Sequence, residues 1–280
     1  MSNPGLLANQ ITGFLAGRSV RIVPGSDIGW TPPMGEQLFN DFLERVGDIV
    51  KTQIPAWVVQ LPRDRRRRRF NLLILDNAAN PIAFAKFTAN PRNPLTLAAL
   101  ERFRSEPTRR FWSPSLLAAE RVGAYEVTLS TAMPNERHRP AQLSPVDRRW
   151  ILDEIQNRLG DLVVPHVITH GDFAPWNVRR FGNGRVAVVD WEEMTPGVDL
   201  ADEVWFVVCV HARTGGGISR VLDDLGAASR NTQELISSAA QFWLDRLRRP
   251  ESDEIDRNLA IANRLDRFGL RVKDLLESLR

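Results

Sequence analysis

The dipeptide Asn183-Gly184 lies between two short apolar segments, and this turn constrains the fold more than any other feature of the chain. Asn-Gly between two strand-like segments is the strongest short-range indication of a two-residue type I′ hairpin. The flanking strands would be Val178–Gly182 and Arg185–Val189. In the antiparallel register that such a turn imposes, Asn177 faces Asp190.

Directly opposed residues in an antiparallel pair have Cβ atoms roughly 4.5 to 5.5 Å apart. An amide oxygen and a carboxylate at that separation can share one cation. Hard oxygen ligands, completed by water and phosphate oxygens, suit Mg²⁺. The hairpin therefore predicts that Asn177 and Asp190 bind magnesium.

A second acid precedes the hairpin. The β-branched segment Val163–Thr169 is expected to be a buried strand that places His170 and Asp172 at its end. Asp172 comes five residues before Asn177, which is the D-x-x-x-x-N spacing of the kinase catalytic loop. In that loop the acid accepts or orients the proton of the attacking hydroxyl. The spacing predicts one site containing Asp172, Asn177 and Asp190.

Two motifs in this region resemble those of the aminoglycoside phosphotransferase and choline kinase family, whose members are relatives of protein kinases. His170-Gly171-Asp172 with Asn177 is similar to H-G-D-x-x-x-x-N, and Val189-Asp190-Trp191-Glu192 is similar to I/V-D-W/F-E. The resemblance implies that Asp172 is the catalytic base and that Asn177 and Asp190 bind magnesium.

Other residues of the motifs are expected to support the site. The segment around Asp199 is similar to the family's G-x-x-x-D-L-A, although it is shorter by about one residue, and the resemblance implies that Asp199 braces the catalytic loop. We expect His170 to organise the loop through hydrogen bonds. Trp176 and Trp191 are expected to pack.

The upstream sequence contains the elements expected of a nucleotide-binding lobe. Short runs rich in apolar and β-branched residues, separated by turn residues, predict five antiparallel strands. They cover Ala56–Leu61, Phe70–Asp76, Pro81–Thr88, Ser115–Glu120 and Tyr125–Thr131.

A lysine lies within an apolar row of the third of these strands. Alternation places Lys86 on one face with Ile82 and Phe84. The resemblance implies that Lys86 binds the α- and β-phosphates and pairs with a glutamate on a helix. Asn93-Pro94 is a strong helix start, and Glu101 on the following helix is the predicted partner. Alternatively, Lys86 extends to solvent at an edge and Glu101 is one more solvated acid.

The linker between the lobes begins near Ser130. In the resembled fold, backbone groups of this linker bind the adenine edge, which implies nucleotide contacts from Ser130, Thr131, Ala132 and Met133. The expected cofactors are ATP, or GTP in its place, and Mg²⁺.

The loop after the first strand departs from the kinase pattern. Kinases carry glycines there, whereas Pro62–Arg69 contains five consecutive arginines. Long cationic side chains can reach phosphates but do not allow the close backbone approach of glycine. A solvated loop and a contact to nucleic acid or acidic lipid are the alternatives. Nucleic acid is the least favoured, since neither interleaved aromatic residues nor a helix-turn-helix or zinc-finger spacing accompanies the run.

The rest of the second lobe is expected to be helical. Apolar stripes predict helices from Ser144 to Gly160, Thr232 to Arg249 and Ser252 to Arg280, the last broken near Gly269. Glu36–Lys51, ahead of the sheet, is amphipathic as well. The predicted fold is α+β, protein-kinase-like and two-lobed, with an N-terminal antiparallel five-stranded sheet carrying a helix and a mainly helical C-terminal lobe. The expected divisions are an extension at 1–54, a nucleotide-binding lobe at 55–132 and a catalytic and acceptor-binding lobe at 133–280.

The composition agrees with an enzyme of this kind. A chain of 280 residues with 43% hydrophobic residues can bury a large core. No apolar run approaches the roughly 18 residues that a membrane-spanning helix needs, and Leu6–Ala16 lacks the basic region of a secretory signal. Cys209 is the single cysteine, so no intramolecular disulfide can form. We expect a cytoplasmic location and neither a membrane nor a nucleic-acid partner.

The predicted reaction is transfer of the γ-phosphoryl group of ATP to a hydroxyl of a small molecule, such as an aminoglycoside-like antibiotic, a sugar or an amino alcohol. Substrate-binding residues cannot be assigned from the sequence, although Glu193, Asp202 and Glu203 are near enough to be candidates. Two alternatives remain. One is a kinase-fold binding protein without turnover, and the other is a metal hydrolase that uses His166, His170 and Asp172.

Overall fold

The computed structural model describes residues 31–60, 69–227, 229–248 and 267–280. Within them the chain forms two compact units. The first contains 31–60, 69–107, 113–139 and 181–183, and the second contains 108–112, 140–180, 184–227, 229–248 and 267–280. The arginine loop at 62–68, the segment Leu6–Ala16 and the helix expected to start at Ser252 lie outside the described residues, except for the end of that helix.

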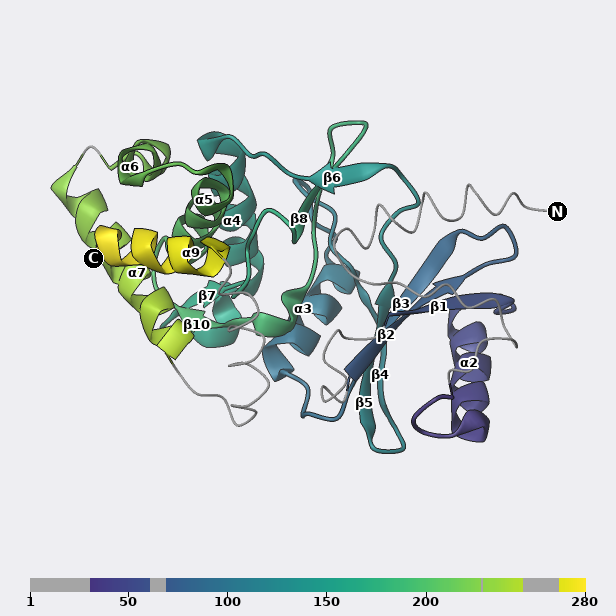
Figure 1. Ribbon diagram of the computed structural model, residues 1–280. Coiled ribbons are helices and arrows are strands. Elements are labelled where there is room, and N and C mark those ends of the chain that lie inside the picture. Colours follow the sequence, from purple (N-terminus) through teal and green to yellow (C-terminus); the bar gives the residue numbers. More distant parts are fainter. Residues whose placement is uncertain (1–30, 61–68, 228, 249–266) are drawn as a thin grey trace. The chain divides into compact units, whose positions relative to one another are not determined.

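The first unit contains the predicted five-stranded antiparallel sheet, in the order β1-β2-β3-β5-β4 (Figure 1). Its strands are β1 (Ala56–Gln60), β2 (Arg69–Leu75), β3 (Pro81–Thr88), β4 (Leu116–Val122) and β5 (Tyr125–Thr131). All four pairings are antiparallel. This confirms the predicted sheet.

One face of the sheet packs against helix α2 (Glu36–Val50). The alternation in β3 places Ala83, Ala85 and Phe87 in this core, and Phe42 of α2 meets Phe87 edge to face at 5.0 Å between ring centroids. The helix that the sequence assigns to an N-terminal extension is thus part of the core of the first unit. The opposite face of β3 carries Lys86, which is partly buried.

Helix α3 (Pro94–Ser105) follows the sheet's third strand and starts where the sequence predicts. The side chain of Asn93 accepts a hydrogen bond from the Leu95 amide at 3.0 Å, and Pro94 occupies the first helical position. Proline costs nothing there, because the first amides of a helix have no partner within it.

The second unit is mainly helical. Its core is built by helices α5, α6, α7 and α9, with α4 beside them. The bounds are α4 (Pro145–Leu159), α5 (Ala201–Thr214), α6 (Ile218–Leu225), α7 (Arg230–Arg248) and α9 (Arg267–Leu279). Helix α9 begins at Arg267 and runs through Gly269, and the break predicted near that glycine stays a prediction, because residues 249–266 are outside the described part of the chain. No helix in the described part of the chain has the length and apolar character needed to cross a membrane.

Helix α4 begins as predicted, with the Ser144 hydroxyl accepting from the Asp147 amide at 3.1 Å. Ile151, Ile155 and Leu159 are buried, because a spacing of four residues keeps them on one face. Trp150 is also apolar, but it is 50% exposed. It neighbours Ile151 in sequence and therefore lies about 100° around the helix from the buried face.

Short strands build the centre of the second unit. Strand β7 (Val167–Thr169) pairs antiparallel with β10 (Thr195–Gly197), and β8 (Val178–Phe181) pairs with β9 (Val186–Val188). The strand predicted from Val163 is shorter, since Gly160–Val163 form a 3₁₀ turn and Val164-Pro165 is a cis peptide. A second 3₁₀ turn covers Trp191–Glu193, and β6 (His138–Pro140) lies where the chain passes from the first unit to the second.

The β8–β9 hairpin forms, but its predicted register is wrong by one residue. Arg180 pairs with Val186 and Val178 with Val188, so Asn177 lies opposite Val189, whose amide donates to the Asn177 carbonyl at 2.9 Å. The connection is therefore longer than a two-residue turn. Gly184 supplies the left-handed residue, at φ 86°, that such longer loops require.

Candidate active site

The candidate catalytic loop leaves β7 at Thr169 and is held from within by His170. The His170 side chain is fully buried, and its Nε2 donates to the Val189 carbonyl at 3.1 Å. Its Nδ1 then accepts from the Asp172 amide at 3.3 Å. Both ring nitrogens are used, so His170 organises the loop and has no lone pair left for a metal.

A carboxylate at the start of α5 braces the same loop, and it is Asp202. Its Oδ2 accepts from the His170 amide at 2.7 Å and its Oδ1 accepts from the Gly171 amide at 3.3 Å. The sequence assigned this role to Asp199, which is instead exposed. Three residues further on, Asp202 lies in the first turn of α5, where its side chain reaches two adjacent amides of the loop.

Asp172 lies at the centre of the site and receives three hydrogen bonds. Its Oδ1 accepts from Trp205 Nε1 at 3.0 Å, and its Oδ2 accepts from Asn177 Nδ2 at 2.7 Å and from Trp176 Nε1 at 3.3 Å. Trp176, expected only to pack, is thus a donor. Trp205 was not anticipated at all, because its donor reaches Asp172 from helix α5, 33 residues away.

Burial raises the pKa of the Asp172 carboxyl from 3.8 to about 6. The hydrogen bonds from the two indoles and from Asn177 lower that pKa, whereas the charge of Asp190 raises it further. A carboxylate with a pKa near 6 is a stronger base than an exposed aspartate and is still ionised at neutral pH. Its environment thus suits proton abstraction from a hydroxyl.

Asp190 comes two residues after the end of strand β9 and adopts a left-handed backbone conformation, at φ 70° and ψ 56°. Non-glycine residues rarely do so, although aspartate tolerates it better than most. Its negative charge raises the pKa of Asp172, so the two carboxylates are near each other even though Asp190 does not face Asn177 across the ladder. A residue in a sparsely populated conformation at such a position is typical of functional sites.

Asn177 and Asp190 provide a donor set suited to a hard cation. The Asn177 side-chain nitrogen donates to the Asp172 carboxylate at 2.7 Å and to the Asp172 backbone carbonyl at 3.0 Å. These two bonds fix the orientation of the amide and therefore the position of its oxygen. An amide oxygen and a carboxylate, completed by water and phosphate, fit Mg²⁺. The residues present are therefore compatible with the predicted metal.

The metal hydrolase alternative finds no support in this geometry. Both ring nitrogens of His170 are hydrogen-bonded, and His166 is exposed. Among the described residues, no group of three or more His, Cys, Asp or Glu side chains is arranged to hold a metal.

Aromatic and ionic contacts from helix α7 support the site from behind. Trp205 stacks on Trp243 with ring centroids 4.3 Å apart. Arg246 donates to the Glu193 carbonyl at 3.1 Å and pairs with the Glu193 carboxylate at 2.7 Å. Glu193 was a candidate for acceptor binding, and it is engaged here in holding the segment after Asp190.

The other two acids suggested for acceptor binding also have structural partners. Asp202 braces the catalytic loop, and the Glu203 side chain is buried with its Oε1 at 3.6 Å from Arg148 Nε and 3.8 Å from Arg149 Nε. Neither carboxylate is exposed to solvent.

The predicted nucleotide contacts lie in the first unit. Lys86 is partly buried in β3, in register with Asn71 on β2 and Thr128 on β5. Glu101 is exposed and pairs with Arg104 at 3.4 Å. The pairing of Lys86 with Glu101 stays a prediction.

The linker residues begin at the end of β5. Ser130 and Met133 are buried, and the Thr131 amide donates to the Ser115 carbonyl at 2.9 Å. The Ala132 amide donates to the Ile82 carbonyl at 3.4 Å. Their role in binding a nucleotide stays a prediction.

Replacing Trp205 with phenylalanine is expected to shift the acidic limb of the pH–kcat/KM profile to higher pH. The substitution removes the hydrogen bond that does most to lower the Asp172 pKa, while a ring remains to stack on Trp243. Steady-state rates between pH 5 and 9 measure the shift. Trp150→Phe, on the exposed surface of α4, is the matched control, and identical limbs in all three proteins would contradict the assignment of Asp172 as the titrating base.

Replacing Asp202 with asparagine is expected to destabilise the protein by about 1–3 kcal/mol at pH 4, because the NH₂ group of an amide would face one of the two loop N–H donors, whereas both oxygens of the protonated carboxyl keep lone pairs that can accept. Burial raises the pKa of Asp202 to about 7 from 3.8. The folded state thus binds the proton more tightly than the unfolded state, and the stability that this acid contributes is present below pH 4 and is lost as pH rises through 7.

The difference in unfolding free energy between wild type and Asp202→Asn should therefore shrink from pH 4 to pH 7, as measured by urea denaturation. Asp199→Asn is the control and should change stability by less than about 0.5 kcal/mol, since Asp199 is exposed. A larger loss in Asp199→Asn than in Asp202→Asn would restore the original assignment.

The chain is similar to known proteins in sequence and in fold. Residues 95–235, which are 141 of the 280, match the model of a family described as the phosphotransferase enzyme family. The matched region contains Asp172, Asn177 and Asp190. No curated protein matches the chain by sequence.

Two solved structures are similar over most of the chain. One is the spectinomycin phosphotransferase APH(9)-Ia in complex with ADP and spectinomycin, at 11% identity and a TM-score of 0.54, covering 86% of this chain and 98% of that one. The other is a thermostable mutant of the aminoglycoside phosphotransferase APH(4)-Ia with ADP and hygromycin B, at 13% identity and a TM-score of 0.50, covering 84% and 98%. At these identities the likeness shows the fold, and it confirms the predicted kinase-like class.

Proposed function

Because the chain belongs to the phosphotransferase enzyme family, we propose that it transfers the γ-phosphoryl group of ATP to a hydroxyl of a small molecule. Membership confirms the predicted class of enzyme, a small-molecule kinase. The observation that carries the proposal is the environment of Asp172, whose buried carboxylate receives three N–H donors and has a pKa raised to about 6.

In this proposal Asp172 orients the acceptor hydroxyl and takes its proton. The donors from Trp176, Trp205 and Asn177 hold both oxygens of the carboxylate, so its orientation is set before the acceptor arrives. Such positioning is a large part of catalysis in phosphoryl transfer, where the protein does little covalent chemistry.

Asn177 and Asp190 would hold Mg²⁺ through their side-chain oxygens. When bound, the ion would supply positive charge that offsets the negative charge developing on the transferred phosphoryl group. Lys86 would bind the nucleotide phosphates, with Glu101 as its proposed partner, and the backbone from Ser130 to Met133 would bind the base. The ADP bound in both similar enzymes supports ATP as the phosphoryl donor.

The acceptor class is proposed from the same relatives. One similar structure holds spectinomycin and the other hygromycin B. An aminoglycoside-like antibiotic is the first candidate for this chain, followed by sugars and amino alcohols.

The proposal is tested by an acceptor screen that follows ADP release with ATP and Mg²⁺ present. Aminoglycosides and spectinomycin come first, and sugars and choline-like alcohols follow. Acceptor-dependent ADP release, with a mass increase of one phosphoryl group on the acceptor, supports a small-molecule kinase. Nucleotide binding without consumption across the whole panel would instead identify a kinase-fold binding protein.

Replacing Asp190 with alanine is expected to raise the Mg²⁺ concentration needed for half-maximal activity by roughly tenfold or more, because the site loses its charged ligand. Titration of Mg²⁺ at fixed ATP and acceptor measures it. Asp274→Ala, an exposed substitution on α9, is the control. An unchanged Mg²⁺ requirement in Asp190→Ala would remove Asp190 from the metal site.

A further inference from the structure

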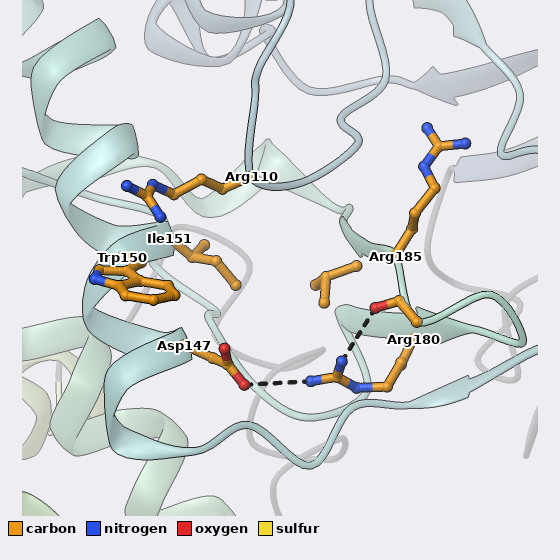
Figure 2. Close-up of a pocket in the computed structure, with 8 residues that line it drawn as sticks. Arg110, Asp147, Trp150, Ile151, Arg180 and Arg185 are labelled. Atoms are coloured by element: carbon orange, nitrogen blue, oxygen red, sulfur yellow. Dashed lines mark hydrogen bonds and ion pairs between the residues drawn. The ribbon is translucent and has the colours of Figure 1, made fainter.

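A small cavity of about 150 Å³ lies in the second unit, in a part of the fold that the proposed reaction does not use. Figure 2 shows its lining, which comes from three stretches of chain. Helix α4 contributes Asp147, Trp150 and Ile151, and the β8–β9 hairpin contributes Arg180 and Gly184 to Val186. Arg110, from the segment Thr108–Trp112, completes it.

The walls of the cavity are fixed by hydrogen bonds. The Arg110 amide donates to the Glu154 carboxylate at 2.8 Å. The Trp112 amide donates to the Val186 carbonyl at 2.7 Å, and the Val188 amide donates to the Trp112 carbonyl at 2.9 Å. These bonds tie the Arg110 segment both to α4 and to β9, so a ligand would meet a site that is already formed.

The charge of the lining favours an anion. Three arginines and one aspartate line the cavity, and the guanidinium groups of Arg110 and Arg180 supply its positive charge. The guanidinium of Arg110 lies over the Trp150 ring, at 4.8 Å from its centroid, and the described part of the chain offers this group no acidic partner. Figure 2 shows Arg110 and Trp150 on one side of the cavity and Arg180 on another, while Arg185 extends away from the Arg180–Asp147 pair.

The ion pair of Arg180 is weak enough to be rearranged by a ligand. Its Nη2 lies 3.5 Å from Asp147 Oδ2, and the Asp147 side chain is 42% exposed. Ion pairs with a solvated partner such as Asp147 contribute little to stability, because water screens the charges. Arg180 also donates to the Gly184 carbonyl at 3.1 Å, which keeps its guanidinium at the cavity.

The lining also has an apolar surface for a planar group. Ile151 and Val186 are buried at the cavity, and Trp150 is half exposed beside them. A large exposed aromatic ring next to a guanidinium can stack on a flat ligand while the cation binds its anionic end. The volume is well below that of a site for a drug-sized molecule, which limits the ligand to a small one.

We propose that this cavity binds a small planar organic anion, with a phosphate or carboxylate group between Arg110 and Arg180 and an apolar ring against Trp150. The site would be separate from the phosphoryl-transfer site, and it does not depend on the proposed function.

The test uses the full chain labelled with 5-fluorotryptophan, in which the ¹⁹F resonance of Trp150 is identified by its loss in Trp150→Phe. Phenyl phosphate, benzoate and inorganic phosphate are titrated separately. A readout at Trp150 is insensitive to phosphate compounds that bind at the catalytic site. We expect a saturable shift of the Trp150 resonance with phenyl phosphate or benzoate. The compound that binds more tightly shows whether the site prefers a phosphate or a carboxylate group.

Arg110→Gln and Arg180→Gln are each expected to weaken this binding by roughly tenfold or more, the size of one hydrogen bond to a charged group. Arg213→Gln, an exposed substitution on α5, should leave it unchanged. Melting temperatures of the variants verify that they are folded. Inorganic phosphate should bind more weakly than phenyl phosphate, since it leaves the indole uncovered.

Three results would overturn the proposal. The Trp150 resonance could stay in place with all three compounds, or shift equally in wild type and in both arginine variants. A decathymidylate that shifts this resonance at lower concentration than phenyl phosphate would assign the surface to single-stranded nucleic acid instead.

Discussion

Replacing Asp172 with alanine is expected to reduce kcat by about 10²- to 10⁴-fold, the usual contribution of a general base. Nucleotide binding should persist, because the residues proposed to bind the nucleotide are elsewhere in the chain. The measurements are steady-state ADP release with the acceptor found in the screen, and calorimetric titration of ATP analogue with Mg²⁺.

Two further variants separate the chemistry of Asp172 from its structural contacts. Asp172→Asn keeps the size of the side chain and one acceptor oxygen for the surrounding donors, but it cannot take a proton, so its loss of turnover should be similar to that of alanine. Asp274→Ala removes an exposed carboxylate of the same unit and should retain wild-type turnover. Normal turnover in Asp172→Asn would show that Asp172 is not the base.

Replacing Gly171 with alanine is expected to cause a large loss of stability, because the added methyl group would overlap a neighbouring segment of backbone. Gly171 has φ +80°, and a Cβ there would lie 1.8 Å from the Glu193 carbonyl oxygen. That oxygen belongs to the backbone and is held by Arg246, so one of the two segments must move. The left-handed backbone alone costs an L-residue on the order of 1–3 kcal/mol, and the overlap adds to it.

Movement of the loop at Gly171 displaces the neighbouring Asp172, and a misplacement of about 1 Å can cost roughly 10²-fold in rate. Gly184→Ala is the matched control. Gly184 has a similar φ of +86°, but a Cβ added there would have no atom of a non-neighbouring residue within 4 Å. It carries the backbone strain without the overlap. Thermal denaturation and turnover of both variants test this. Equal losses in Gly171→Ala and Gly184→Ala would contradict the close packing of Gly171 on Glu193.

Local signals in the sequence were reliable where a few neighbouring residues decide the outcome. Asn93 and Ser144 cap helices at the predicted positions, since capping depends on amides two or three residues away. The alternation of β3 placed Lys86 correctly on the face opposite Phe87. The five strands followed from the same kind of pattern.

The register of the β8–β9 hairpin could not be predicted from neighbouring residues alone. Gly182, Asn183 and Gly184 together permit either a two-residue turn or a longer loop. The longer loop forms where Trp112, more than 70 residues away in sequence, bridges the outer side of β9 through two backbone hydrogen bonds. No turn rule contains that contact, so the sequence placed the hairpin correctly and its pairing wrongly.

The bracing acid was missed for a similar reason. Asp199 and Asp202 are both near the start of α5, and a helix of 3.6 residues per turn can present only one of them to a given loop. Which one faces the amides of His170 and Gly171 depends on how α5 packs in the second unit. Trp205 reaches Asp172 through the same packing, and the period of the helix does not reveal it.

By itself the sequence determined the elements, the sheet, the order of the motifs and the family, because these depend on short spacings and on residue chemistry. Only the tertiary structure decided which side chains surround Asp172, which acid holds the loop, and that Asp190 adopts a left-handed backbone conformation. These outcomes depend on contacts between segments distant in the chain, and such contacts are set by burial and packing of whole elements rather than by any local preference.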